Sequence, residues 1–375
     1  MRMHRRGLSS TKSSDDSSIA STTSFTTHSS LAELLKEFDY DALILDQFGV
    51  LHNGKNALDG TIDCVERIAN GNDEADQKKL RLIVLSNTSS PSKTTLDRLD
   101  KKLGFDRSYF CGAVTSGEEA GRHIQQTYGT SDTKKSKFVW CTWDVTNENV
   151  PDPTAFLDLL GPNVEPTVDV SSADFVVAHG SGAIRGYSKQ GAEQEIISMG
   201  SFMDDGNLGE GTPISNLLEE CAQRKLPLVC ANPDMVVQYH DGSLKHMPGK
   251  IAKRYQDILE EEQNENADDL PSITIFGKPH TEHFEACLRK LEEARSNEEQ
   301  NGDTTQPLRV AHVGDSLHHD IAGANAAGVP NIFIYAEELL SADDDKGAMP
   351  SDEKLQELFD REGITPTHVL SLFQY

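Results

Sequence analysis

Short runs of apolar residues alternate with amphipathic segments along most of the chain, and several of the runs end in polar residues. Residues 61–69 place Ile62, Val65 and Ile68 on one face of a predicted helix, and residues 31–38 predict a shorter amphipathic helix. Buried strands that alternate with helices are typical of a parallel sheet with helices on both faces. The pattern therefore predicts an α/β protein with a doubly wound parallel sheet.

Asp46 directly follows the apolar run 42–45, and Gly49 comes three residues later. In open α/β sheets, ligands bind outside the carboxyl ends of the strands, and a glycine lets the backbone turn close to them. Asp46 is therefore a candidate nucleophile or metal ligand. Taken alone, the same pattern also fits an Asp that caps the next turn.

Two further strand ends carry groups that suit a phosphoryl group. The apolar run 82–85 opens into Ser86 and Asn87, and a predicted helix follows whose free N–H groups attract anions. Helix capping is the alternative for these polar residues. The run 273–276 leads to Lys278, whose ammonium either offsets phosphate charge or is solvated at the surface.

The strand end after residues 310–313 is the most informative of the four. Asp315 follows this strand, and Asp320 begins a helix rich in small residues. Together with Asp46, these carboxylates form an oxygen-rich site of the kind that Mg²⁺ prefers. Capping explains one Asp pair at a strand–helix junction, but it does not explain all four strand ends.

These four strand ends resemble the four motifs of the haloacid dehalogenase superfamily of phosphoryl-transfer enzymes. The long segment between the second and third motifs resembles the large α/β cap of a subclass that includes nitrophenyl phosphatase-like and sugar-phosphate phosphatase-like proteins. Residues 228–234 are similar to a strand followed by Asn-Pro-Asp in that subclass, and residues 248–252 resemble the return from cap to core. The resemblance runs from about residue 31 to the C-terminus.

The resemblance implies a Rossmann-like core formed by residues 31–115 and 249–375, with the cap, residues 116–248, inserted between them. The cap would select the substrate, and Asn232 and Asp234 would face the active site. An Asx-Pro turn is the alternative for these two residues. Dimerisation through the cap is common in similar proteins, so a homodimer is one expected state.

The resemblance also assigns roles to the strand-end residues. Asp46 would be the nucleophile that forms an aspartyl-phosphate. The phosphoryl oxygens would be held by Ser86, Asn87 and Lys278. The ligands of the cofactor, Mg²⁺, would be Asp46, the backbone carbonyl of Phe48, Asp315 and Asp320. The substrate would be a small phosphorylated metabolite.

Phe48 departs from the family pattern. Family phosphatases usually carry a second Asp two residues after the nucleophile, which protonates the leaving alcohol and then activates water. Phenylalanine cannot transfer a proton, and such help is worth about 10²–10⁴-fold in rate. His52, His318 and His319 are candidate replacements, because imidazole titrates near neutrality.

Two functions remain open at this point. One is a phosphatase that favours good leaving groups, such as aryl and acyl phosphates, because these need no acid. The other is a phosphometabolite-binding or regulatory protein with little turnover, which the absence of the usual acid at Phe48 favours and the otherwise complete motif set opposes.

Composition narrows the class of protein. The chain has 375 residues, enough for two domains. Its formal net charge of -26 opposes a nucleic-acid partner, because duplex phosphates repel an acidic surface. The six cysteines include no C-x-x-C pair, so neither a zinc cluster nor a disulfide framework is predicted and a reducing compartment is expected. No apolar run approaches the roughly 20 residues that cross a bilayer, so no membrane partner is expected.

The N-terminus differs from the rest of the chain. Half of residues 1–30 are Ser or Thr, and Arg2, Arg5 and Arg6 precede the first acid. This composition predicts a disordered tail in a cytoplasmic protein. An organelle transit peptide, directing the chain to a mitochondrion or plastid, is the alternative.

Overall fold

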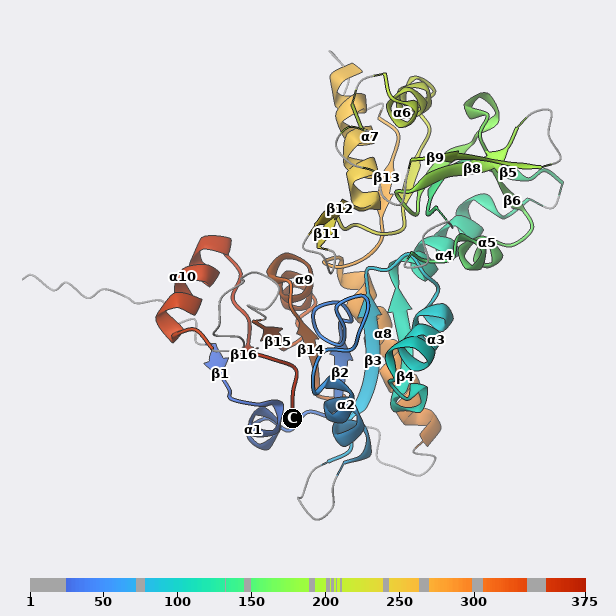
Figure 1. The fold of residues 1–375 in the computed structure, drawn as a ribbon. Helices are drawn as coiled ribbons and strands as arrows, with labels where there is room; N and C mark the ends of the chain where they lie inside the picture. The colour runs from blue at the N-terminus through green and yellow to red at the C-terminus, as the bar shows by residue number, and fades with distance from the viewer. Residues whose placement is uncertain are drawn as a thin grey trace, which may run out of the picture.

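A computed structural model describes the chain at residues 25–71, 78–131, 133–144, 150–188, 193–199, 203, 206, 208–209, 211–238, 243–262, 270–298, 306–335 and 349–375. Two seven-stranded sheets dominate these residues, and they lie one above the other in Figure 1. A separate antiparallel pair, β11 (Val236–Gln238) and β12 (Leu244–His246), lies between them in that view.

The first sheet, the lower one in Figure 1, is parallel throughout, in the order β1-β16-β15-β14-β2-β3-β4. Its strands are β1 (Thr26–Thr27), β2 (Ala42–Leu45), β3 (Arg81–Ser86), β4 (Phe110–Thr115), β14 (Val310–Gly314), β15 (Asn331–Ile334) and β16 (His368–Leu370). β2 and β14 are neighbours, and Leu45 pairs with Val313. The carboxyl ends of these two strands therefore open at the same edge.

Helices cover both faces of the first sheet. One face packs against α1 (Leu31–Glu37), α2 (Thr61–Asn70) and α3 (Ser92–Leu103). The other packs against α8 (Thr281–Glu298), α9 (Ala322–Ala326) and α10 (Asp352–Glu362). The alternation arises because successive strand residues point to opposite faces: Leu43 and Leu45 face α1 and α2, while Ala42 and Ile44 face α8. This arrangement confirms the predicted doubly wound core.

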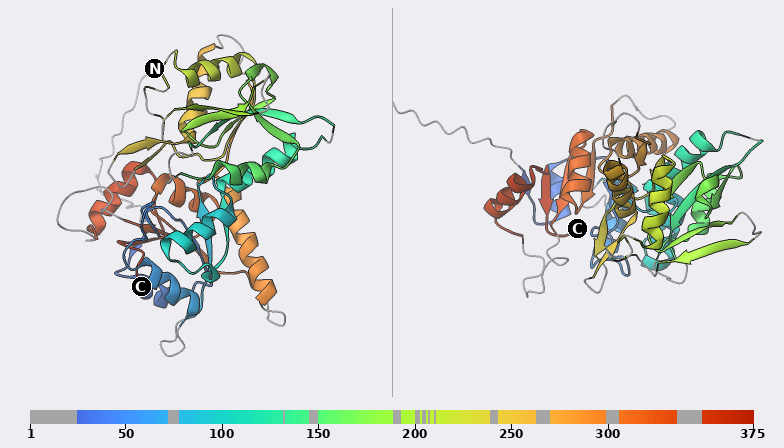
Figure 2. Two further views of the ribbon diagram at one scale, coloured as in Figure 1. Left: turned by 45° about the vertical axis from the view of Figure 1, so that its right-hand side comes forward. Right: turned by 90° about the horizontal axis from the view of Figure 1, so that it is seen from above.

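The second sheet is mixed, in the order β13-β10-β7-β5-β6-β8-β9. Its strands are β5 (Ser136–Thr142), β6 (Val164–Thr167), β7 (Phe175–Ala178), β8 (Ala183–Tyr187), β9 (Gln194–Ser198), β10 (Leu228–Cys230) and β13 (Ile273–Ile275). One face packs against α4 (Ser116–Tyr128) and α5 (Pro153–Leu160), and the other against α6 (Pro213–Gln223) and α7 (Pro248–Glu262). Figure 2 shows this second α/β body, the predicted cap, from two further sides.

The second body includes more of the chain than the predicted cap, residues 116–248. β13 pairs in parallel with β10, and Ile251 and Tyr255 of α7 pack into the core of the second sheet. The chain therefore returns to the first body after Phe276, not at residue 249 as expected. The apolar run predicted a strand correctly, but a single strand carries no sign of which sheet it will join.

Part of the predicted tail, residues 1–30, also belongs to the fold. β1 pairs in parallel with β16, and the Ser30 hydroxyl accepts a hydrogen bond from the Glu33 N–H at the start of α1. Residues 1–24 lie outside the described residues. Among the helices that the structure describes, none combines the length and the apolar character that a membrane crossing requires.

Candidate active site

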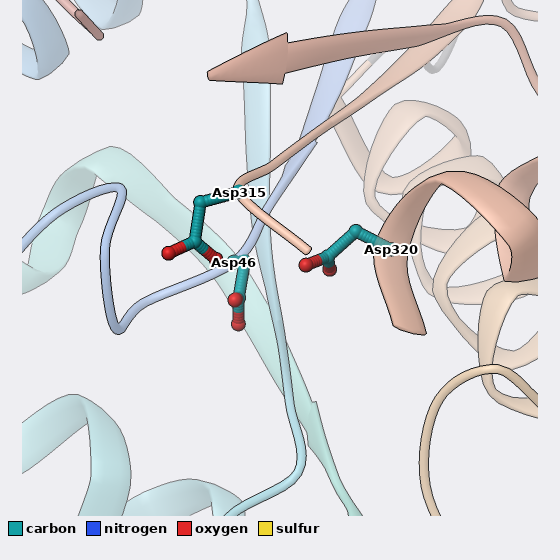
Figure 3. Close-up of side chains that lie close together, drawn as sticks. All are labelled: Asp46, Asp315 and Asp320. Atoms are coloured by element: carbon teal, nitrogen blue, oxygen red, sulfur yellow. The ribbon is translucent and has the colours of Figure 1, made fainter. Parts of the chain in front are cut away.

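Three carboxylates converge where the strands of the first sheet end. Asp46 follows β2, Asp315 follows the neighbouring strand β14, and Asp320 lies in a short π-helical segment after β14. In Figure 3, Asp46 and Asp315 lie side by side and Asp320 faces them. One oxygen of each residue lies within 4.8 Å of the other two. The structure thus brings together the three aspartates that the sequence singled out.

Lys278 reaches these carboxylates from the segment that joins β13 to α8. Its Nζ lies 2.7 Å from Asp46 Oδ1 and 2.6 Å from Asp320 Oδ1. Its side chain is 3% exposed, so the surface-lysine alternative is excluded. One ammonium beside three carboxylates leaves the site with an excess of negative charge whenever all three are ionised.

Burial raises the pKa of Asp46 to about 7, with Lys278 opposing the increase and Asp320 adding to it. Burial and the charge of Asp46 also raise the pKa of Asp315. In Asp320 burial acts in the same direction, but Lys278 and His312 outweigh it and lower the pKa. Two of the three carboxyls therefore hold protons unusually well. A hard divalent cation with oxygen ligands would replace those protons, so the donor set fits Mg²⁺.

His312, which was not among the residues predicted from the sequence, holds Asp320 in place. Its ring lies in β14 with Nε2 2.8 Å from Asp320 Oδ1 and Nδ1 3.1 Å from the Ile44 carbonyl oxygen. The Ser316 N–H donates to the other carboxylate oxygen of Asp320 at 3.1 Å. A histidine within an otherwise apolar, fully buried strand was the sequence signal that could have identified this contact.

The turn after Asp46 requires glycine. Gly49 has a φ of 81°, and a Cβ added there would lie 1.7 Å from Asp315 Oδ2. The Gly49 N–H donates to the His52 carbonyl oxygen at 2.9 Å, which closes the turn. Among the described residues, the Phe48 carbonyl oxygen accepts no backbone hydrogen bond, so it remains available to a ligand.

We expect Mg²⁺ to raise the melting temperature of the protein, and to raise it more at pH 8 than at pH 5. Carboxyls with a raised pKa stabilise the folded state below their unfolded pKa, and this stabilisation is lost as the pH rises through about 7, the pKa of Asp46. At pH 5 the cation must displace protons from the carboxyls, whereas at pH 8 it relieves the repulsion between ionised carboxylates. Saturation at 100 times Kd would contribute about 2.7 kcal/mol.

Differential scanning fluorimetry with Mg²⁺ or EDTA measures this effect. Asp315→Asn removes one of the expected ligands, and Asp100→Asn, at an exposed carboxylate on α3, is the matched control. A rise that is equal at both pH values, or unchanged in Asp315→Asn, would contradict a cation site at the three aspartates.

The loop after β3 differs in part from its predicted role. The Ser86 hydroxyl accepts a hydrogen bond from the Thr88 N–H at 3.2 Å, and within the described part of the chain it donates to no other group. The start of α3 was expected to offer free N–H groups to a phosphoryl group. Instead, the Glu118 carboxylate from α4 accepts the Ser92 N–H at 2.8 Å. One N–H of this helix start is therefore bonded to a side chain that lies 26 residues away in sequence.

Asn87 bridges the two bodies. Its Oδ1 accepts the Lys278 backbone N–H at 2.7 Å, and its Nδ2 donates to Asp234 Oδ1 at 2.8 Å. Both polar atoms of Asn87 are thus already bonded, and the phosphate-binding role expected of it remains a prediction. The bridge positions Lys278 and brings Asp234, from the loop after β10, to the edge of the site.

Asn232 forms the Asx turn that was its alternative interpretation. Its Oδ1 accepts the Asp234 N–H at 2.9 Å, and the residue is buried. The Asp234 side chain is 26% exposed, and His319 Nδ1 lies 3.6 Å from its Oδ1. Of these two residues, Asp234 therefore has the accessible side chain, and Asn232 fixes the backbone conformation at Asp234.

Two of the three histidines considered as replacements for the usual acid are poorly placed. His52 Nδ1 accepts the Gly54 N–H at 3.0 Å, and burial together with the nearby Arg98 lowers its pKa to about 3. Its ring packs edge-to-face with Phe48, 6.3 Å between centroids. His318 is 66% exposed and pairs with Glu362 on the surface. His319 lies nearer, beside Asp234.

Comparison with known protein families gives two matches, and both contain residues of this site. A family model described as haloacid dehalogenase-like hydrolase matches residues 43–149, and a second, described as HAD-hydrolase-like, matches residues 275–355. The first match contains Asp46 and the loop after β3, and the second contains Lys278 and the Asp315–Asp320 pair. A comparison with curated proteins finds no match.

Several solved structures share the fold. A haloacid dehalogenase-like hydrolase from Brucella suis matches with a TM-score of 0.58 and 22% identity, covering 92% of this chain and 99% of that one. A possible sugar phosphatase from Cytophaga hutchinsonii matches with a TM-score of 0.60 and 17% identity, covering 94% and 99%. A p-nitrophenyl phosphatase from Archaeoglobus fulgidus matches with a TM-score of 0.51 and 17% identity, covering 89% and 97%. The two family matches and the site they contain show that the chain belongs to the haloacid dehalogenase-like hydrolase family.

Proposed function

We propose that the protein is a Mg²⁺-dependent phosphatase that hydrolyses a small phosphorylated metabolite through an aspartyl-phosphate on Asp46. The observation that carries the proposal is the convergence of Asp46, Lys278 and the Asp315–Asp320 pair at one sheet edge. Proteins of similar fold include a possible sugar phosphatase and a p-nitrophenyl phosphatase, which is consistent with this reaction class.

The side chains have complementary tasks in this reaction. The Asp46 carboxylate attacks phosphorus, and Lys278, held by Asp46 and Asp320, places its ammonium where phosphoryl oxygens carry charge. Ser86 supplies a hydroxyl donor beside them. Bound Mg²⁺ would neutralise further phosphoryl charge. Its ligands would be Asp46, the Phe48 carbonyl, Asp315 and Asp320.

The cap contributes the substrate-facing residues. We infer that Asp234 contacts the part of the substrate that leaves, because its accessible carboxyl lies beside Asn87 at the edge of the site. Asn232 acts through the turn that holds Asp234. The second candidate function, a phosphometabolite-binding protein with little turnover, is favoured by Phe48, which occupies the position of the usual acid and packs against His52.

Phosphate release from aryl, acyl, sugar and alkyl phosphates with Mg²⁺ tests the proposal, together with acid quenching and intact-mass measurement of the protein. We expect a phosphorylated protein to be trapped in the wild type but not in Asp46→Asn, and release by that variant to fall to background. Asp100→Asn is the matched control and should behave as the wild type.

Equal background release from wild type and Asp46→Asn, with a phosphometabolite still raising the melting temperature, would contradict the phosphatase. That outcome would support the binding protein instead, since a ligand that binds the native state alone stabilises it.

A further inference from the structure

We propose that Asp234, supplied by the cap, carries the proton that the usual second aspartate carries, and so replaces the acid and base lost at Phe48. This inference rests on the proposed function and names a catalytic residue for it. It changes one expectation from the sequence, because alkyl phosphates would then retain acid help despite Phe48.

The first support is the position of the Asp234 carboxyl. The loop after β10 carries it from the cap to the loop after β3, where Asn87 Nδ2 donates to its Oδ1 at 2.8 Å. Asn87 in turn binds the backbone of Lys278, whose Nζ lies 2.7 Å from the Asp46 nucleophile. Asp234 is thus connected to the nucleophile through two residues, on the side where the cap meets the site.

The second support is that the carboxyl is both held and reachable. The Asp234 N–H donates to Asn232 Oδ1, and its carbonyl oxygen accepts the Gly249 N–H at 3.0 Å. Gly249 packs closely here, since an added Cβ would lie 2.2 Å from the Pro233 carbonyl oxygen. The backbone is therefore fixed, whereas the side chain keeps 26% of its surface open to a ligand.

The third support is that, apart from His319, the other candidate proton carriers are poorly placed or carry no proton. Phe48 has no proton to give, His52 is buried with Nδ1 bonded to the Gly54 N–H, and His318 pairs with Glu362 at the surface. His319 lies 3.6 Å from Asp234 Oδ1, so it is a neighbour of the carboxyl.

The charges around Asp234 are compatible with proton transfer. Burial raises its pKa, while His319, Asn87 and Lys278 oppose the increase and the charge of Asp320 adds to it. A carboxyl with a raised pKa holds a proton for longer as the pH rises toward neutrality, which is what a general acid requires.

The proposed steps balance. In the first, an Asp46 oxygen forms a bond to phosphorus, the bond from phosphorus to the leaving oxygen breaks, and the Asp234 proton moves to that oxygen. In the second, a water oxygen forms a bond to phosphorus and the Asp46–phosphorus bond breaks. The water proton moves to the Asp234 carboxylate, which restores the acid and releases inorganic phosphate.

The test is the dependence of the Asp234→Asn effect on the leaving group. We expect Asp234→Asn to lower kcat/KM for an alkyl phosphate by about 10²–10⁴-fold and for an aryl phosphate much less, because phenolates leave without acid. Asp158→Asn, an exposed carboxylate on α5 of the cap, is the control and should change neither. Phe48→Asp, which restores an acid at the usual position, should recover alkyl phosphate turnover in the Asp234→Asn background.

If Asp234→Asn only removed a structural contact, the loss would not depend on the leaving group. Equal losses on both substrates, or no recovery by Phe48→Asp, would overturn the role of Asp234 while Asp46-dependent release kept the proposed function standing. Release that does not depend on Asp46 would overturn both. Melting temperatures of all variants, measured alongside, show whether any loss arises from unfolding.

Discussion

Lys278→Met is expected to abolish phosphate release and to destabilise the protein by about 3–5 kcal/mol at pH 8, the cost of breaking a buried ion pair from one side. Methionine keeps the length and packing of the side chain but removes the ammonium. Asp46 and Asp320 then lie buried without the charge that contacts both, at 2.7 and 2.6 Å.

The pH dependence of this loss follows from the shifts in pKa. Lys278 has a raised pKa, so its stabilisation is present throughout the range from pH 5 to 8 and would be lost only at much higher pH. The lowered pKa of Asp320 means that its stabilisation is lost only as the pH falls through the folded value. In Lys278→Met, protonation of Asp46 at low pH relieves the uncompensated charge. The destabilisation should therefore be smaller at pH 5 than at pH 8.

Urea unfolding at the two pH values measures the difference. Lys253→Met removes an exposed lysine that pairs with Asp257 on α7, and a change of well under 1 kcal/mol is expected for it. A Lys278→Met protein as stable as the wild type at pH 8, or one that still releases phosphate, would show that the lysine is not the counter-charge of the site.

The carboxylate site could be predicted from the sequence because the position of each aspartate depends mainly on the strand next to it in the chain. Asp46 directly follows β2 and Asp315 directly follows β14, and the carboxyl ends of parallel neighbouring strands meet at one edge. Asp320 adds a third oxygen from the next turn of chain. No contact between distant segments had to be known beyond the pairing of β2 with β14.

The parts that the sequence did not predict depend on contacts between distant segments. Asn87 and Asp234 are 147 residues apart, and Glu118 reaches the start of α3 from another helix. Each was a polar residue at a strand or helix end, a pattern that fits many partners equally well. The sequence also did not show that β13 belongs to the second sheet, because that depends on its pairing with β10, a strand distant in the chain.

Substitution of Gly49 by alanine should lower phosphate release by about 10²-fold or more, the scale of effect that a misplacement of about 1 Å has in an active site. The φ of 81° costs an alanine about 1–2 kcal/mol, and its Cβ would lie 1.7 Å from Asp315 Oδ2. Asp315 directly follows β14, and its side chain is short, so the carboxylate has little freedom to avoid the new Cβ. Its carboxylate must therefore leave its present position beside Asp46, which should also weaken Mg²⁺ binding.

Gly54→Ala separates the cost of backbone strain from the cost of the steric contact with Asp315. Gly54 has a φ of 89°, so alanine there carries similar backbone strain, but its Cβ would lie 3.3 Å from the nearest atom, in the Phe48 ring, and far less must shift. Both variants should lose about 1–2 kcal/mol of stability to backbone strain, and Gly49→Ala should lose more because of its steric contact. Gly49→Ala alone should also lose the Mg²⁺-dependent rise in melting temperature and most phosphate release. If both variants lost activity equally, strain in the turn would be the cause, and the contact between Gly49 and Asp315 would not be what fixes the metal ligands.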